Sequence, residues 1–505
     1  MMKRTLYLIT SLAVASIAAV ALVRNSTVPP AASLAAPSWT EPVIPDTPAG
    51  RQLRSFLVAF NGGHEDELKQ FIKTQFTPLG PGGSDLAART NSQLRLYKTS
   101  RGLNLYEVAE SSDESITVVA QFRLTQEWRR MTFMIEDAPS HRISGIKIVP
   151  VDAPVIATTK PQTNKQFRHE IDDYIQSLVA VDQFSGVVLV AKDGAPLFEK
   201  AYAMANRELG WPNQPSTRFS FASVGKMFTA VAVAQLVHAG KLAYDEPLTR
   251  LLPEFPADTA RQITIDHLLT HRSGIIDFFA NSERFKQVMD SSNPQRDYLS
   301  VFIDEPLRFT PGERFEYSNS NYILLGAIIE RLSGLTYEEY LLKHVFGPAG
   351  MSETGLSTAE VGEHLMATAY TQMGENEQLG VGARHPFTVF SSPTGSAAGG
   401  GYTTARDLLK FERALRTHKL LPASATEQLL VDRVEYERPG YRYGYGFILR
   451  QAGQERVAGH SGGFPGVDAQ FDMYLDSGYS IIVLSNYELV AEPITMHIQQ
   501  LLRRT

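Results

Sequence analysis

The chain has 505 residues, which is more than the ~100–200 residues typical of one domain and predicts two folded parts. Apolar residues make up 43% of the chain and charged residues 20%, proportions that exclude a wholly disordered protein. The net charge is −6 and no long basic run occurs, so the footprint of a nucleic-acid-binding protein is absent. There is no cysteine, which excludes disulfides, thiolate catalysis and zinc bound by cysteine.

The first 45 residues are expected to be a signal peptide or membrane anchor followed by a linker. Lys3 and Arg4 precede the uncharged stretch Leu6–Val23, and the small residues Ser33–Ala36 follow it. A basic start, an apolar segment and an A-x-A-like site are typical of a secretory signal. We therefore expect an exported protein, periplasmic or extracellular. Either the leader is cleaved or Leu6–Val23 remains as a membrane anchor.

Residues 46–150 are predicted to form a small α+β domain. Apolar residues recur at helical spacing in 46–61 and 65–76. From Leu103 the period changes, and strand-like segments occupy 115–124, 127–136 and 141–150. Two helices followed by about four antiparallel strands resemble, in layout only, a nuclear-transport-factor-2-like (NTF2-like, cystatin-like) domain. Domains with this layout can hold a ligand, dimerise or only pack. Because no acid–base constellation is present, a second active site is not expected here.

Residues 151–166 carry prolines and threonines and are predicted to be a linker, which leaves 167–505 as the second domain. A helix near 167–181 precedes a hairpin, 186–191 and 196–201, which turns at Asp193-Gly194. Near the other end, 445–450, 468–475 and 479–486 are predicted strands, and 492–503 is a helix. Strands at both ends around a mostly helical middle predict an α+β fold: an antiparallel sheet flanked by helices, plus a helical subdomain.

The first candidate motif is Ser223-Val224-Gly225-Lys226, which leads into the helical segment 227–238. A serine at a helix start meets free N–H groups and the positive end of the helix dipole. The i, i+3 spacing also places Lys226 one turn away on the same face, where it can accept the hydroxyl proton or supply a positive field. Taken alone, the pattern is common by chance and is more typical of a serine N-cap.

Two further candidates lie far along the chain. In Tyr317-Ser318-Asn319 the phenol can shuttle a proton when positive charge favours the phenolate, and the amide can hold both Lys226 and a substrate carbonyl. The glycines of His460-Ser461-Gly462-Gly463 let the backbone approach a ligand, so that an N–H there can complete an oxyanion hole with Ser223. Alone, each motif also fits core packing, a helix cap or a tight turn.

Together, S-x-x-K, Y-x-N and a basic residue-x-Gly, in this order, resemble the serine β-lactamase and penicillin-binding family. The class C β-lactamase-like branch, with its esterases, D-aminopeptidases and DD-carboxypeptidases, is the most similar. The stretches 263–275 (ITIDHLLTHRSGI) and 397–409 (AAGGGYTTARDLL) support this resemblance, which spans about 184–487.

The resemblance implies a role for each matching residue. Ser223 would be the acylated nucleophile, Lys226 and Tyr317 the proton-handling pair, and Asn319 a substrate-orienting group. His460, Ser461 and Gly462 would belong to the substrate-binding strand, and Gly463 would donate the second oxyanion hydrogen bond. His271 would be structural. No cofactor and no metal would be needed.

The sequence departs from this family pattern at His460, where true β-lactamases and DD-peptidases usually have lysine. Histidine is mostly neutral near pH 7, which weakens recognition of a substrate carboxylate and removes charge that would lower the pKa of Tyr317. We therefore expect a poor β-lactamase that acts on a small ester, amide or short peptide. The alternatives are a cell-wall DD-carboxypeptidase or β-lactamase, and a non-catalytic binding protein with the same fold.

Overall fold

The computed structural model describes residues 39–80, 83–151, 154, 163–358, 361–373, 383–387, 394–438 and 440–504. Most of the leader and most of the predicted linker therefore lie outside the described residues. Within the described part of the chain, no helix combines the length and apolar character that crossing a bilayer requires.

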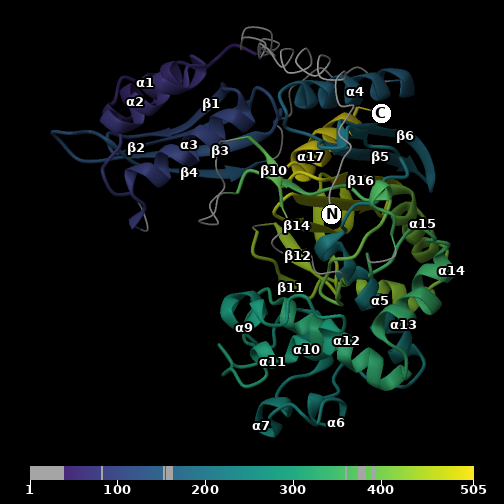
Figure 1. Cartoon of the computed structure of the whole chain (residues 1–505). Helices are drawn as coiled ribbons and strands as arrows, with labels where there is room; N and C mark the ends of the chain where they lie inside the picture. Colours follow the sequence, from purple (N-terminus) through teal and green to yellow (C-terminus); the bar gives the residue numbers. More distant parts are fainter. Residues whose placement is uncertain are drawn as a thin grey trace, which may run out of the picture.

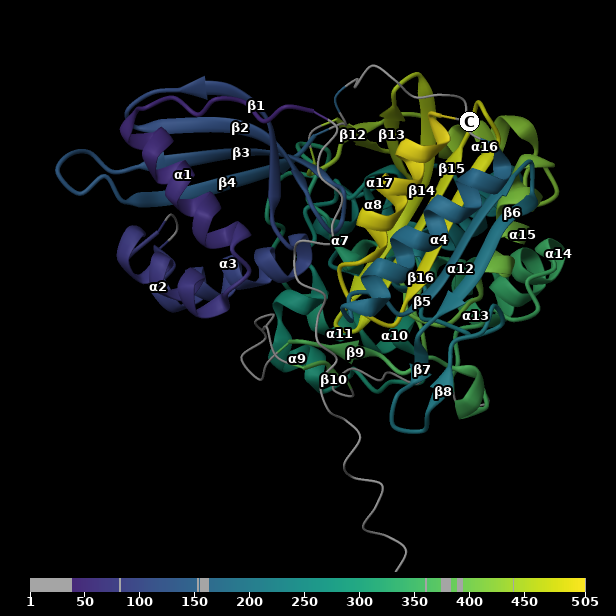
Figure 2. The same ribbon diagram turned by 90° about the horizontal axis from the view of Figure 1, so that it is seen from above.

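The first domain has three helices packed on one four-stranded antiparallel sheet (Figures 1 and 2). Its strands pair in chain order, and its core is an apolar cluster that includes Phe56, Phe60 and Phe133. The elements are α1 (Pro48–Asn61), α2 (Glu65–Gln75), α3 (Leu86–Ser100), β1 (Leu103–Ser111), β2 (Ser115–Phe122), β3 (Trp128–Ile135) and β4 (Ile143–Pro150).

This domain confirms the predicted α+β class and adds one helix. The sequence analysis did not identify α3, because its polar residues leave only a short apolar stripe of Leu94 and Tyr97. Asp85 caps α3 by accepting a hydrogen bond from the backbone N–H of Ala88 at 2.7 Å. The likeness to NTF2-like domains stays a prediction.

The second domain is built on an eight-stranded antiparallel sheet, in the order β11-β12-β13-β14-β15-β16-β5-β6. The first and last segments of the domain meet where β16 pairs with β5, as the sequence predicted. The strands are β5 (Gly186–Lys192), β6 (Ala195–Tyr202), β11 (Val434–Glu435), β12 (Tyr441–Tyr443), β13 (Ile448–Ala452), β14 (Glu455–Phe464), β15 (Val467–Tyr474) and β16 (Tyr479–Ser485).

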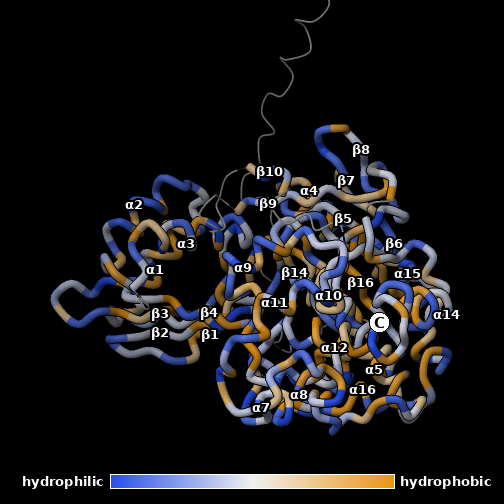
Figure 3. The backbone as a smooth tube through the Cα atoms, turned by 60° about the horizontal axis from the view of Figure 1, so that its bottom comes forward, coloured by the Kyte–Doolittle hydropathy of each residue, from blue (hydrophilic) through white to orange (hydrophobic). Residues whose placement is uncertain are grey.

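Helices cover both faces of this sheet (Figure 2). Alternate residues of β5 point to opposite sides: Val188 and Val190 join α4 (Asn164–Ala180) and α17 (Ala491–Leu502), while Leu189 faces the other helices. Those helices are α5 (Lys226–His238) and α15 (Ala405–Arg416), which contact the strands, and α16 (Ala423–Leu429), which packs on α5. Helix α12 (Asn319–Ser333) packs on α5 as well, from the helical subdomain. Figure 3 shows hydrophobic segments around α5 and α16 and hydrophilic ones in many outer turns.

A helical subdomain lies beyond one end of the sheet, at the bottom of Figure 1. It contains α12 together with short elements, which are α6 (Leu248–Leu251), α7 (Ala257–Ala260), α8 (Ile265–Leu269), η4 (Phe278–Ala280), α9 (Ser282–Lys286), α10 (Pro294–Asp297), α11 (Leu299–Phe302) and α13 (Tyr337–Leu341). The remaining short elements are β7 (Met204–Asn206), β8 (Trp211–Pro212), η3 (Ala222–Gly225), η5 (Leu342–Phe346), α14 (Gly347–Ala349), η6 (Glu363–Leu365), β9 (Tyr370–Thr371) and β10 (His385–Pro386).

Two boundaries differ from expectation. Helix α4 begins at Asn164, inside the predicted linker, because Thr163 and Gln166 form a capping box. The segment 460–463 was placed between two strands, but it belongs to β14, whose pairing with β15 runs unbroken from Val457 to Phe464. Its two glycines are typical of a turn, whereas in the strand Gly462 allows other backbone to approach closely.

Candidate active site

Ser223 lies in a single tight turn, η3, that leads directly into α5. The residue before it, Ala222, has a φ of 43°, a left-handed conformation that is strained for a residue with a side chain. The helix proper begins only at Lys226, so the predicted helix-start serine sits one short turn earlier. This turn presents Ser223 to a cleft between the sheet and the helical subdomain.

Lys226 is completely buried and points at Ser223. Its Nζ lies 3.2 Å from the Ser223 Oγ, 2.7 Å from the Asn319 Oδ1 and 2.5 Å from the Ala398 carbonyl oxygen. Burial lowers the pKa of Lys226 to about 7, although the Asp277 carboxylate acts in the opposite direction. A substantial fraction of this lysine is therefore a neutral amine near pH 7.

Tyr317 completes a trio with Ser223 and Lys226. Its hydroxyl faces the Ser223 side chain, and its ring centroid lies 4.9 Å from the Lys226 Nζ. His271 stacks on the Tyr317 ring, with the two ring centroids 4.2 Å apart. Burial raises the pKa of Tyr317 well above its usual value, so a resting phenolate is not favoured. The Asp277 carboxylate also raises this pKa, so the expected lowering of the pKa by positive charge does not occur.

Asn319 is the first residue of α12 and connects two charged groups. Its Oδ1 accepts from Lys226, as predicted, while its Nδ2 donates to the Asp277 Oδ2 at 2.8 Å. The amide was expected to be available to a substrate carbonyl. One of its two N–H bonds is instead occupied by Asp277, and the second can still reach a substrate.

His460 lies on β14 and is 2% exposed. Its Nε2 is 3.1 Å from the Tyr443 hydroxyl, its Nδ1 is 2.5 Å from the Ser461 carbonyl oxygen, and its ring centroid is 6.5 Å from that of Tyr317. Burial and the nearby Lys226 lower the pKa of His460 to about 3. The imidazole is thus uncharged near neutral pH.

Gly462 lets strand β14 lie against the serine turn. A Cβ on Gly462 would be 2.6 Å from the Phe221 carbonyl oxygen and 2.8 Å from the Ser223 backbone nitrogen, distances that real Cβ atoms do not show. Gly463, the next residue, lines the cleft beside Ser223. The structure therefore brings together all three predicted motifs.

The cleft has a volume of about 490 Å³. Aromatic and apolar side chains from two parts of the chain form its walls: Phe278, Phe279, Phe285, Met289 and Tyr298 on one side, and Met366, Phe387, Phe464, Pro465 and Val467 on the other. None of the described residues that line it carries a charged side chain. The cleft is therefore suited to apolar substrates.

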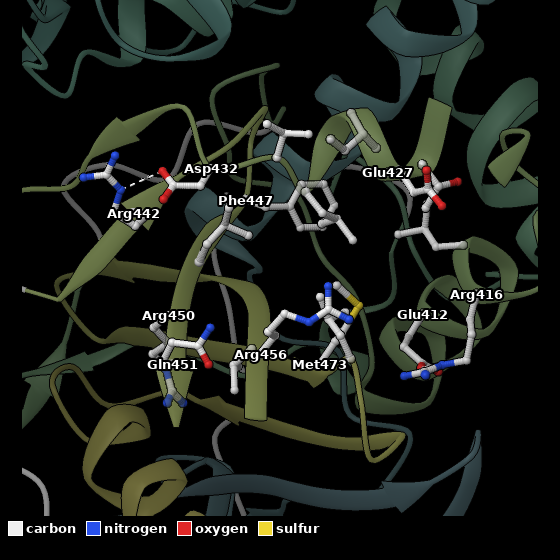
Figure 4. Close-up of a pocket in the computed structure, with 18 of the residues that line it drawn as sticks. Glu412, Arg416, Glu427, Asp432, Arg442, Phe447, Arg450, Gln451, Arg456 and Met473 are labelled. Carbon is white, nitrogen blue, oxygen red and sulfur yellow. Dashed lines mark hydrogen bonds and ion pairs between the residues drawn. The ribbon is translucent and has the colours of Figure 1, made fainter. Parts of the chain in front are cut away.

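A second cavity, of about 630 Å³, lies between α15, α16 and the strands β13–β15 (Figure 4). Two pairs form among its charged residues, Arg442 with Asp432 at 2.6 Å and Arg416 with Glu412 at 2.6 Å. None of the eight predicted site residues lines it. A larger volume therefore does not identify the candidate site.

The sequence analysis missed three groups that contact the predicted residues: the Asp277 carboxylate, the Ala398 carbonyl and the Tyr443 hydroxyl. The sequence did contain an indication of Asp277 and Ala398. Asp277 follows the stretch 263–275, and Ala398 lies in the stretch 397–409, both of which supported the family resemblance. His271 was assigned a structural role, and it packs on Tyr317 with its Nδ1 3.1 Å from the Ser318 backbone nitrogen.

Comparison with known proteins places this site in a family. The model of the family described as Beta-lactamase matches residues 171–500. The chain belongs to the beta-lactamase family. Relatives include penicillin-binding protein 4* of Bacillus subtilis, 29% identical over 64% of this chain and 72% of that protein. Esterase EstB of Burkholderia gladioli is 31% identical over 61% of this chain and 88% of that protein.

A solved structure confirms the fold. The crystal structure of a penicillin-binding protein from Bacillus halodurans is 33% identical and superimposes with a TM-score of 0.57. The match covers 67% of this chain and 99% of that one. The family model begins after the first domain, for which no family is assigned.

Proposed function

We propose that this protein is a serine hydrolase that forms an acyl-enzyme on Ser223 and acts on esters or amides without a free carboxylate. The observation that carries the proposal is the convergence of Ser223, Lys226 and Tyr317 at one end of the apolar cleft. A nucleophile beside a base that other groups orient is the general arrangement of covalent catalysis.

The contacts of Lys226 favour its action as the general base. A neutral amine has two N–H bonds and one lone pair in a tetrahedral arrangement. The Asn319 Oδ1 and the Ala398 carbonyl accept the two N–H bonds, which leaves the lone pair to face the Ser223 Oγ. With a pKa of about 7, Lys226 can take the hydroxyl proton as Ser223 attacks the substrate carbonyl carbon.

The rest of the reaction is assigned by position. The backbone N–H groups of Ser223 and Gly463 would stabilise the oxyanion, since Gly463 lines the cleft next to the serine turn. Tyr317 would donate its proton to the leaving group and regain one from Lys226, which restores both groups. Water would then release the acyl group. An alcohol or amine in its place would make the site an acyl transferase.

The substrate class follows from what surrounds the site. The described lining of the cleft has no cation to pair with a carboxylate, and His460 is neutral. Penicillin-type substrates carry such a carboxylate. Because the similar EstB is named an esterase, we rank esters and amides of apolar acids above β-lactams.

The experiment that tests the proposal is labelling with a fluorophosphonate, followed by intact-mass measurement. The wild-type protein should gain one phosphonyl group and the Ser223→Ala variant none. A panel of nitrophenyl esters and a chromogenic cephalosporin then ranks the substrates. An unlabelled, folded wild-type protein would support the non-catalytic binding protein. Faster cephalosporin than ester turnover would contradict the substrate class.

A DD-carboxypeptidase is the second candidate, favoured by the similarity to penicillin-binding protein 4*. This candidate requires recognition of a terminal carboxylate, for which the described cleft offers no charged partner. Release of D-alanine from a peptide ending in D-alanyl-D-alanine, at a rate above that of ester hydrolysis, would establish it.

Export is a separate part of the proposal and rests on the leader sequence alone. The basic start and the stretch Leu6–Val23 favour secretion to the periplasm or the exterior. Determination of the mature N-terminus in cell fractions would separate a cleaved signal from a retained anchor. An intact protein in the cytosol would contradict export.

A further inference from the structure

Asp277 contacts the candidate site but has no role in the proposed reaction. It precedes the short turn η4, at the N-terminal end of α12. Its Oδ2 accepts hydrogen bonds from the backbone N–H of Asn319 at 2.7 Å and from the Asn319 Nδ2 at 2.8 Å. Its Oδ1 accepts from the backbone N–H of Phe279, a residue of the cleft wall, at 2.9 Å.

These contacts determine which way the Asn319 amide faces. An ionised carboxylate can only accept hydrogen bonds, so the side of the amide that faces Asp277 must be its NH₂ group. The amide is planar, and its oxygen therefore faces away from Asp277. That oxygen is the atom that accepts from Lys226 at 2.7 Å.

We propose that Asp277 is a positioning residue for acylation: by orienting Asn319, it directs the lone pair of Lys226 toward Ser223. The inference rests on the proposed function, because it concerns the base of that reaction. If Asn319 turned its NH₂ group toward Lys226, two donors would face each other, and Lys226 would lose one of the acceptors that hold it.

Asp277 also acts on Lys226 through its charge. The other titratable groups that face Lys226 are Tyr317 and Tyr322, with ring centroids 4.9 and 5.4 Å from its Nζ, and the histidines at 271 and 460. Burial raises the pKa of both tyrosines and lowers that of both histidines, so all four are uncharged near pH 7. Asp277 thus provides the charge that opposes the effect of burial on the Lys226 pKa.

Two substitutions separate orientation from charge. In Asp277→Asn, the new Oδ1 can still accept from Asn319, so the orientation is kept while the charge is lost. In Asp277→Ala, both are lost. Asp85 offers matched controls, Asp85→Asn and Asp85→Ala, because it also caps a helix through a side-chain oxygen but lies in the first domain.

The measurement is the rate of fluorophosphonate labelling per folded molecule, at pH 6 and pH 8, with thermal melting of each variant. Asp277→Asn should keep most of the wild-type labelling rate at pH 8. The ratio of its labelling rate at pH 6 to its labelling rate at pH 8 should be about fivefold higher than in the wild type, because the pKa of Lys226 falls when an opposite charge is removed. Asp277→Ala should lose about tenfold or more at pH 8. The Asp85 variants should keep the wild-type ratio.

The possible outcomes are distinct. Variants that melt earlier but keep the wild-type rate and pH ratio per folded molecule would reduce Asp277 to a purely structural residue and overturn the proposal. Equal losses in Asp277→Asn and Asp277→Ala at pH 8 would overturn the orienting role. If the wild-type protein is not labelled at all, the proposed function fails first, which the wild-type control reports separately.

Discussion

The hydroxyl oxygen of Tyr443 lies 3.1 Å from the Nε2 of His460, within hydrogen-bonding distance. Tyr443 also approaches the Nε2 of His271 at 3.3 Å, and His271 stacks on Tyr317. Tyr443 thus gives the His460 ring an uncharged partner, and burial together with the nearby Lys226 lowers the pKa of His460 to about 3, which leaves the ring neutral. The resemblance to β-lactamases places a lysine at this position in enzymes that bind substrate carboxylates.

The substitution His460→Lys should accordingly shift the preference toward carboxylate substrates. We expect the ratio of kcat/KM for a cephalosporin to kcat/KM for a nitrophenyl ester to rise about tenfold, the contribution of one charge-assisted contact. His460→Gln, which adds no charge, is the control. An unchanged ratio in folded His460→Lys protein would mean that another group decides this preference.

The acylation rate should depend on the protonation of Lys226. Because its pKa is about 7 and the neutral amine is the base, the labelling rate should level off above that pH and fall about tenfold per pH unit below it. Fluorophosphonate labelling from pH 5 to pH 9 measures this pH dependence. Lys226→Met, which fills the same buried space, should lose about a hundredfold or more. A wild-type rate independent of pH in this range would exclude Lys226 as the base.

The aromatic wall of the cleft should determine the preferred size of the substrate. Phe279 lines the cleft and is 43% exposed, so its ring is available to a ligand. Phe279→Ala should raise KM about tenfold for a long-chain or aryl ester and leave an acetate ester nearly unchanged, because only the larger group reaches the ring. Leu209→Ala, an apolar residue 49% exposed and outside the cleft lining, is the control. Equal changes for both esters would contradict a size-selecting wall.

The sequence predicted most accurately the contacts between residues that are close together in the chain. The spacing of Ser223 and Lys226 is one helical turn, so their 3.2 Å approach follows from backbone geometry. The contact of Lys226 with Ala398 joins residues far apart in the chain, and no periodicity reports such a contact. Similarly, the glycines at 462 and 463 suggest a turn, and only the tertiary approach of the serine turn explains why the strand carries Gly462.

The direction of the Tyr317 pKa shift also could not be predicted from the sequence. The phenolate was expected to be favoured by neighbouring positive charge, yet desolvation is the largest effect on this group. Burial depends on how the helical subdomain, β12 and β14 close around the ring. That closure is a property of the assembled fold and not of the Tyr317-Ser318-Asn319 motif.

The two domains should unfold together, because one turn of the first domain belongs to the core of the second. Leu124, in the turn between β2 and β3, is 3% exposed and packs in the apolar cluster between the sheet, α4 and α17. Beside it, the Tyr174 hydroxyl of α4 donates to the Thr125 carbonyl oxygen at 2.9 Å. Leu124→Ala should therefore lower the free energy of unfolding by about 2–3 kcal/mol.

Denaturation followed by both circular dichroism and fluorophosphonate labelling measures this effect, since labelling reports only the second domain. Leu79→Ala, on the first domain and 66% exposed, should change the stability by less than about 0.5 kcal/mol. In Leu124→Ala, loss of labelling should move to lower denaturant together with the loss of helix signal. If labelling were lost at the wild-type midpoint while the first domain unfolded earlier, the domains would be independent, and Leu124 would not stabilise the catalytic unit.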